Sequence, residues 1–220
     1  MNPIASFLFN GLEFFLRGGF FMGCLLVLSI IALTVIILRG TALLYHKILP
    51  APILDEIENF NGEKGDRLIS TCVRYPSPLG RIILVLLRHR NWPRAENVEA
   101  VQTRARRETS LMEMGLVILE IATGIAPLIG LLGTLSGLVS VFANVGETGR
   151  PEVVARGISE ALNNTIVGLA LAACALIAHS YFYRRIEVMA VEMESIVSDL
   201  MIKCYPRQQT EMNMPKKSDD

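Results

Sequence analysis

Three long stretches without a charged side chain constrain this chain of 220 residues more than any other feature. They cover residues 18–38, 121–146 and 161–183. Each is long enough to cross a hydrocarbon core of ~30 Å as a helix that rises ~1.5 Å per residue. Three buried helices of a soluble protein are the alternative. That reading is disfavoured because 51% of the residues are hydrophobic and the mean hydropathy is +0.42. The sequence therefore predicts an all-α integral membrane protein with three transmembrane helices extended into a cytoplasmic helical bundle.

Basic residues are distributed unevenly around these stretches. Residues 39–115 contain 12 Lys and Arg and residues 184–220 contain six, whereas residues 1–17 contain one and residues 147–160 contain two. Loops that stay in the cytoplasm carry an excess of Lys and Arg close to the membrane. We therefore expect the long loop and the C-terminus in the cytoplasm and the N-terminus in the periplasm.

These features divide the chain into eight segments. In order they are a periplasmic interfacial helix (1–17), transmembrane helix 1 (18–38), a cytoplasmic helical domain (39–116), transmembrane helix 2 (117–145), a periplasmic loop (146–156), transmembrane helix 3 (157–183), a cytoplasmic helix (184–205) and a disordered tail (206–220). The four cysteines are scattered without a Cys-x-x-Cys pair, so we expect no disulfide, no metal and no cofactor.

Two transmembrane helices are expected to continue into the cytoplasmic loop. The first transmembrane helix should continue through residues 41–49, until Pro50 breaks it. Residues 94–114 lack glycine and proline and are rich in charge, which predicts a polar helix that runs straight into the second transmembrane helix. Such a helix either packs against partners or is solvated on all sides, and the sequence leaves both open.

Glu160 lies beside the third uncharged stretch, where a carboxylate costs several kcal/mol unless it is paired or neutralised. Thr134 lies about 13 residues before the external turn and Glu160 about 12 residues after it, so both are roughly 20 Å from the turn and share a depth. Thr165 lies about one turn deeper. Asn163 and Asn164 place two amides on the face of the carboxylate, and we interpret them as pore-lining candidates. Either threonine alone is more simply read as bonding back to its own helix.

The second stretch also carries a strip of small residues. Gly130, Gly133 and Gly137 follow the spacing i, i+3, i+7, which places them on one side of a helix and favours close helix packing in a membrane. Pro127 precedes them and predicts a kink.

An enzymatic interpretation is disfavoured. Ser136 and His179 could suggest the Ser/His dyad of an intramembrane protease, but their depths differ by ~30 Å, against the ~3 Å that such a pair needs. We therefore expect no enzyme. Glu120, at the cytoplasmic mouth, is better explained by a surface or vestibule position.

The residues resemble the TolQ/ExbB family of proton-channel proteins over about residues 19–183. The most specific similarity is residues 126–134 (APLIGLLGT), followed by residues 158–162 (ISEAL), while residues 77–81 (SPLGR) look like the cytoplasmic segment of the family. The resemblance implies that Thr134, Glu160 and Thr165 are the polar residues of the proton pathway. Two departures are Cys174-Ala175, where the family often has a proline, and the polar pair Asn163 and Asn164.

The resemblance also implies partners and a location. It implies a homopentamer in the bacterial inner membrane around a single-span ExbD/TolR-type protein, which works on a TonB- or TolA-type linker, with no nucleic acid involved. The expected function is an ExbB-like motor subunit that uses the proton-motive force to energise TonB-dependent outer-membrane transport. A TolQ-like subunit of the Tol-Pal envelope-integrity system and a non-conducting membrane scaffold remain the alternatives. A MotA-type flagellar role is disfavoured because that branch has four spans.

Overall fold

The computed structural model describes residues 19–61, 65–148 and 151–205. These residues are almost entirely helical, and no β-strand occurs among them. The prediction of an all-α fold is therefore confirmed. The predicted interfacial helix (1–17) and disordered tail (206–220) lie outside the described residues.

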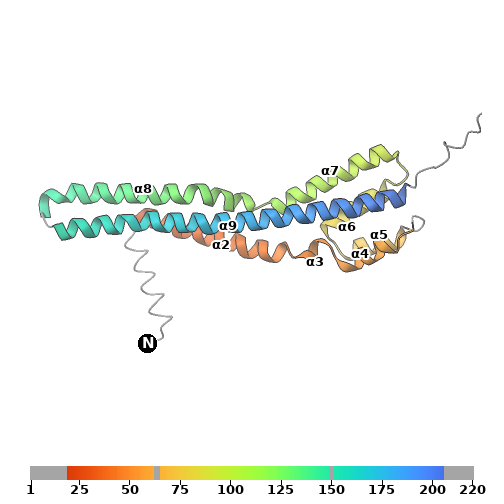
Figure 1. Ribbon diagram of the computed structural model, residues 1–220, viewed down its shortest axis with the longest axis horizontal. Coiled ribbons are helices and arrows are strands. Elements are labelled where there is room, and N and C mark those ends of the chain that lie inside the picture. The colour runs from red at the N-terminus through yellow and green to blue at the C-terminus, as the bar shows by residue number, and fades with distance from the viewer. Residues whose placement is uncertain (1–18, 62–64, 149–150, 206–220) are drawn as a thin grey trace, which may run out of the picture. The chain divides into compact units, whose positions relative to one another are not determined.

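The helices follow one another in a simple order (Figure 1). They are α2 (Gly19–Ala42), α3 (Tyr45–Ile48), α4 (Ala51–Glu58), α5 (Asp66–Arg74), α6 (Pro78–Arg88), α7 (Arg94–Glu113), α8 (Leu116–Thr148) and α9 (Pro151–Cys204). Among them α2, α8 and α9 are long and apolar enough to cross a membrane, as the sequence predicts. At 54 residues α9 is ~81 Å long, more than twice the ~30 Å of a hydrocarbon core, so it must extend well beyond the bilayer.

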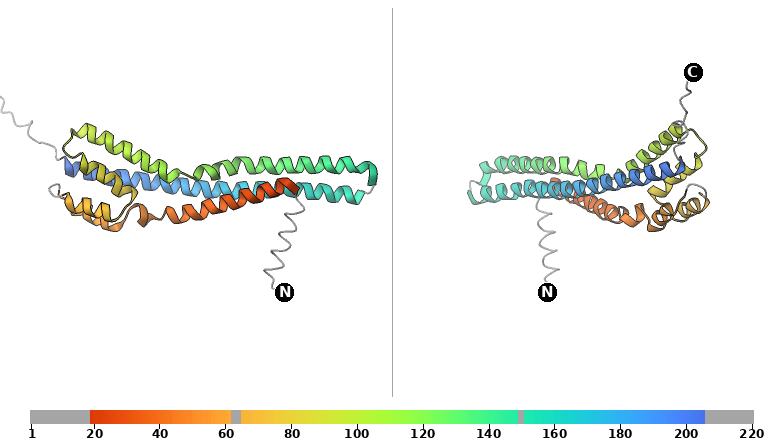
Figure 2. Two further views of the ribbon diagram at one scale, coloured as in Figure 1. Left: turned by 180° about the vertical axis from the view of Figure 1, so that it is seen from behind. Right: turned by 45° about the vertical axis from the view of Figure 1, so that its right-hand side comes forward.

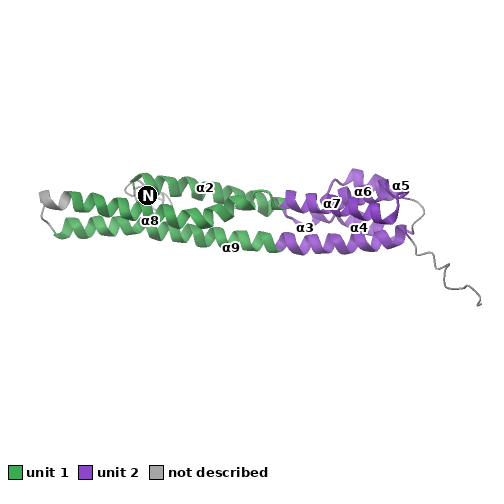
Figure 3. Ribbon diagram, turned by 90° about the horizontal axis from the view of Figure 1, so that it is seen from above, with its two compact units in different colours: residues 1–42, 113–184 green, residues 43–112, 185–220 purple. Residues whose placement is uncertain are grey.

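The chain divides into two compact units (Figure 3). The first unit contains α2, α8 and α9 as far as Arg184. Helices α8 and α9 lie side by side in it, and α2 packs on α8 (Figures 1 and 2). Its core joins Met22 and Leu25 of α2 with Ala126 of α8 and Ala172 of α9. Two of the four residues are alanines, so the helices approach closely here.

The second unit contains α3 to α7 and the end of α9. Its core is formed by large aliphatic side chains that are almost fully buried, including Leu68, Leu79, Ile82, Ile83, Leu86 and Leu200. The Ser77 side chain caps α6 by accepting a hydrogen bond from the Gly80 backbone N–H at 3.1 Å, and Pro78 occupies the first turn, where its missing N–H costs nothing. At the start of the unit, the Tyr45 hydroxyl donates to the Glu192 carboxylate of α9, and this hydrogen bond raises the pKa of Tyr45.

The prediction that the first transmembrane helix continues through residues 41–49 is wrong. Helix α2 ends at Ala42, and a separate turn of helix begins at Tyr45. Leu43, between them, is buried, with 2% of its surface exposed. The burial of Leu43 depends on contacts with other parts of the fold, so the local sequence could not predict it.

The prediction of a straight connection between residues 94–114 and the second transmembrane helix is also wrong. Helix α7 ends at Glu113, and Gly115 has a φ of 93°. Residues other than glycine rarely adopt a positive φ of this size. A Cβ at this position would also lie 2.8 Å from the guanidinium of Arg39. The break therefore depends on one glycine. Along α7 itself, the buried residues Asn97, Val101, Glu108 and Met112 form one stripe, so the helix is packed on one side and is not solvated all round.

Candidate functional site

Two threonine hydroxyls meet between α8 and α9. The hydroxyl groups of Thr134 and Thr165 are hydrogen-bonded to each other. Thr134 Oγ1 also lies 3.2 Å from the carbonyl oxygen of Gly130 and 3.1 Å from that of Ala161, and Thr165 Oγ1 lies 3.3 Å from the carbonyl oxygen of Gly130. The two side chains that were predicted from different stretches of sequence are thus in direct contact.

The chemistry of this pair allows more than one bonding pattern. Each hydroxyl has a single hydrogen to donate but two lone pairs that accept. The two hydrogens can therefore be shared in several ways between the hydroxyls and the carbonyl oxygens of Gly130 and Ala161. A hydroxyl that donates and accepts at once is a group through which a proton can be relayed.

Small residues make this contact possible. A Cβ added to Gly130 would lie 2.7 Å from the carbonyl oxygen of Asn164, and one added to Gly168 would lie 2.6 Å from the carbonyl oxygen of Ala126. Gly133 and Gly137 face the same seam, where a Cβ would lie 2.8 Å from the Asn164 amide and 2.7 Å from the Ala161 methyl, respectively. Gly168 was not among the packing residues predicted, although it is a small residue one turn after Thr165. The four glycines place the backbones of α8 and α9 close enough for their threonines to meet.

Glu160 lies beside this contact but does not join it. Thr134 contacts the carbonyl oxygen of Ala161, so Glu160 is one residue from the point where the two helices meet. Its carboxylate forms an ion pair with Arg156 at 3.1 Å, and 43% of the side chain is exposed. The five residues that separate Glu160 from Thr165 turn the helix by about 140°, which directs the two side chains to different sides of α9. The sequence analysis missed Arg156, although its i, i+4 spacing to Glu160 is a recognisable signal.

The two asparagines occupy different environments. Asn164 is buried, with 4% of its surface exposed, and packs on Gly133. Its Oδ1 accepts no hydrogen bond. Asn163 is only half-buried. The structure therefore places Asn164 in the seam between α8 and α9, against Gly133.

Three other polar residues discussed in the sequence analysis are separate from this contact. Ser136 and Glu120 are exposed on α8. The ring of His179 stacks on that of Tyr183, one turn further along α9, with 6.1 Å between centroids.

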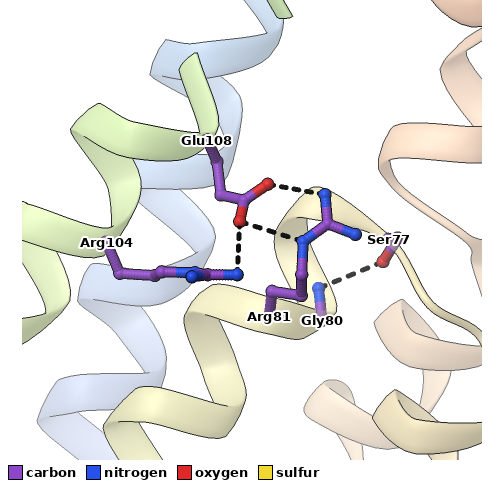
Figure 4. Close-up of polar contacts among 5 residues, drawn as sticks. All are labelled: Ser77, Gly80, Arg81, Arg104 and Glu108. Carbon is purple, nitrogen blue, oxygen red and sulfur yellow. Dashed lines mark hydrogen bonds and ion pairs between the residues drawn. The ribbon is translucent and has the colours of Figure 1, made fainter. Parts of the chain in front are cut away.

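A second polar cluster, which sequence reasoning missed, lies in the other unit (Figure 4). The Glu108 side chain is fully buried, and its carboxylate accepts two hydrogen bonds from Arg81, at 2.9 and 2.6 Å, and pairs with Arg104 at 2.7 Å. The hydrogen bond to Glu108 raises the pKa of Arg81. Two cations thus stabilise one buried anion and join α6 to α7.

Comparison with known proteins identifies the family to which the chain belongs. A sequence profile described as the MotA/TolQ/ExbB proton channel family matches residues 75–195. The chain belongs to this family. The matched region includes Thr134, Glu160 and Thr165 as well as the ion-paired residues Arg81 and Glu108.

Individual relatives agree with this assignment. The chain is 34% identical over 181 residues to a putative biopolymer transport protein, ExbB-like 1, of Synechocystis, which covers 76% of this chain and 68% of the relative. It is 29% identical over 189 residues to a putative biopolymer transport protein ExbB homolog of Methanothermobacter thermautotrophicus, covering 85% and 68%. It is 30% identical over 110 residues to the biopolymer transport protein ExbB of Xanthomonas campestris, covering 49% and 44%. Family membership and three apolar helices together make this a membrane protein of the ExbB-like proton channel family.

Proposed function

We propose that this chain is a motor subunit of the bacterial inner membrane that uses the proton-motive force, together with an ExbD/TolR-type partner, to energise TonB-dependent outer-membrane transport. In this proposal, copies of the chain form a homopentamer whose helices α8 and α9 surround the partner. Protons pass a carboxylate of the partner that faces Thr134, Glu160 and Thr165. Each protonation changes the electrostatic cost of holding that carboxylate against the ring, and this biases the relative rotation of ring and partner.

The contact between the threonines is the observation that carries the proposal. Two hydroxyls, bonded to each other and to backbone carbonyls, lie within the long uncharged stretches of α8 and α9. Glu160 is one residue away from this contact. Ionisable groups at membrane depth are rare and mark ion or proton pathways. The arrangement has the groups that a proton relay requires.

The proposed orientation rests on charge. Arg39 follows the apolar part of α2, and Arg184 and Arg185 follow that of α9. These positions favour a cytoplasmic location for the second unit and a periplasmic location for the connection between α8 and α9. The membrane segments proposed above, residues 18–38, 117–145 and 157–183, fit this orientation.

Replacing Glu160 tests the proposal. We expect Glu160→Ala and Glu160→Gln to abolish proton flux into vesicles that contain the chain and its partner, because neither variant can carry a proton on this side chain. Ring assembly, measured by native mass spectrometry, should be preserved. The matched control is Glu99→Ala, which removes an exposed carboxylate from α7 and should leave the flux unchanged. Full flux in Glu160→Ala would refute the role proposed for this residue.

Co-purification distinguishes the alternatives. Identifying the single-span protein that co-purifies with the chain separates a TonB system from a Tol-Pal system. A non-conducting scaffold would show no flux even when the intact wild-type chain is reconstituted with that partner.

A further inference from the structure

Two polar side chains flank Glu160 on α9, each one helical turn away. Arg156, at i−4, forms the ion pair of 3.1 Å with the carboxylate. Asn164, at i+4, is buried, and its Oδ1 accepts no hydrogen bond. Side chains four residues apart are neighbours on a helix surface. The carboxyl group of Glu160 can therefore reach a cation on one side and an amide oxygen on the other.

These two neighbours favour different protonation states of the same group. A guanidinium only donates hydrogen bonds, so Arg156 stabilises the charged carboxylate. An amide oxygen only accepts them, so Asn164 Oδ1 can bond with Glu160 only when the carboxyl group is protonated and has an O–H to donate. Buried oxygens without a donor are uncommon and unfavourable. The protonated carboxyl group of Glu160 is therefore a suitable hydrogen-bond donor for the unpaired Asn164 Oδ1.

We propose that Glu160 is a two-position switch, which pairs with Arg156 when it is charged and with Asn164 when it is neutral. The inference rests on the proposed function, in which Glu160 carries protons. A hydronium ion from the periplasmic side gives one proton to the carboxylate, which forms one O–H bond and releases one water. This step removes the negative charge and breaks the ion pair. The neutral acid then turns toward the buried amide and donates to Oδ1.

The switch moves the proton inward. Arg156 lies one turn before Glu160 and Asn164 one turn after it, so the carboxyl group turns toward the neighbour further along the helix while its own backbone stays in place. The proton leaves when the acid transfers it to a carboxylate of the proposed partner, and Glu160 then regains its charge and returns to Arg156. Arg156 and Asn164 are positioning residues in this scheme, since Glu160 alone carries the proton.

Few other charged groups face Glu160 from the described residues. On α9, Glu152 lies one turn before Arg156 and is exposed. The facing part of α8, residues 131–143, contains no ionisable side chain. Helix α2 contains only Arg39, near its C-terminal end. Among the described residues, Arg156 is therefore the charged group in contact with the Glu160 carboxylate.

Infrared titration of the full-length chain in lipid nanodiscs tests the switch. The carboxyl signal of Glu160 is isolated as the difference between the wild type and Glu160→Gln, with isotope-labelled glutamate. We expect Arg156→Gln to raise the pH of half-protonation, because the charged form loses its partner. We expect Asn164→Leu to lower it, because the neutral form loses its acceptor. Each shift should be about half to one pH unit, as for the loss of one hydrogen bond.

Matched variants make the result specific. Arg156→Lys keeps the cation and should remain near the wild-type value. Ser136→Ala removes an exposed hydroxyl from α8 and should cause no shift. If Asn164→Leu does not assemble, Asn164→Ala, which only removes atoms, replaces it. Shifts in the same direction, or none, would overturn the switch.

This experiment can fail independently of the proposed function. Opposite shifts without proton flux in vesicles would support the switch and contradict the motor. Flux that depends on Glu160, combined with an unmoved titration, would contradict the switch and leave the motor standing.

Discussion

At the scale of single residues, Glu108 shows how the second unit keeps a charge away from water. A carboxylate without solvent is unfavourable unless partners replace its hydration. Glu108 is fully buried, whereas the side chains of Arg81 and Arg104 retain 39% and 27% exposure. The anion therefore depends on both cations, while each cation remains partly hydrated. The cluster joins two helices at a cost in desolvation that its bidentate geometry offsets.

Removing this charge should destabilise the protein. Glu108→Gln keeps the shape of the side chain but leaves Arg81 and Arg104 without a counter-ion. Breaking a buried ion pair costs ~3 kcal/mol or more, and partial exposure of the arginines reduces this to about 2 kcal/mol. We expect a lower Tm in detergent, measured by differential scanning fluorimetry. Glu99→Gln, on the exposed side of the same helix, is the control. An unchanged Tm would mean that water replaces the Glu108 carboxylate as the hydrogen-bond partner of Arg81 and Arg104.

At the scale of elements, the seam between α8 and α9 depends on the absence of side chains. In a bilayer, apolar helices gain little from excluding water, so close backbone packing and hydrogen bonds hold them together. Gly130 and Gly168 each lie where a Cβ would overlap a backbone oxygen of the other helix. A backbone oxygen cannot rotate away as a side chain can. Any larger residue must therefore separate the helices.

Gly168→Ala should accordingly disrupt the threonine contact. We expect destabilisation by about 1–3 kcal/mol, as for overpacking elsewhere, together with reduced proton flux because the hydroxyls separate. The matched control is Gly124→Ala on α8, where an added Cβ has no neighbour within 4 Å. Equal stability and flux in the two variants would show that the seam tolerates a wider spacing.

At the scale of the whole molecule, α9 belongs to two environments. Its first part contributes to the apolar unit and its last part to the unit with the ion cluster. Because the helix is much longer than a bilayer is thick, we predict that its two ends lie on opposite sides of the membrane.

Cysteine labelling of cells tests this arrangement. Glu152→Cys, near the start of α9, should react with a membrane-impermeant maleimide added to spheroplasts. Glu99→Cys, exposed on α7, should react only after lysis. The wild-type chain measures the background from the native thiols: Cys72 and Cys204 are buried, and burial raises the pKa of the Cys72 thiol to about 11, whereas Cys24 is half-buried and Cys174 is exposed. Labelling of Glu99→Cys from outside would reverse the proposed topology.

The sequence by itself determined the fold class, the three long apolar helices and the polar residues Thr134, Glu160 and Thr165 as candidates. The fold class and the helices follow from composition and periodicity, which act locally along the chain, whereas the resemblance to a known family implied the grouping of the three polar residues. Depth along two antiparallel helices could also be estimated, since the rise per residue is constant.

Only the tertiary structure decided which of these groups touch. It joined the threonines, directed Glu160 to Arg156 and turned Asn164 into the seam, because side-chain contacts depend on rotation about each helix axis and on how closely the backbones approach. It also revealed the break at Gly115, where φ is positive, and the burial of Glu108, which pairs with Arg81, 27 residues away in the sequence. The local pattern of apolar and polar residues specifies the helices, but the packing of α8 against α9 brings the site residues together.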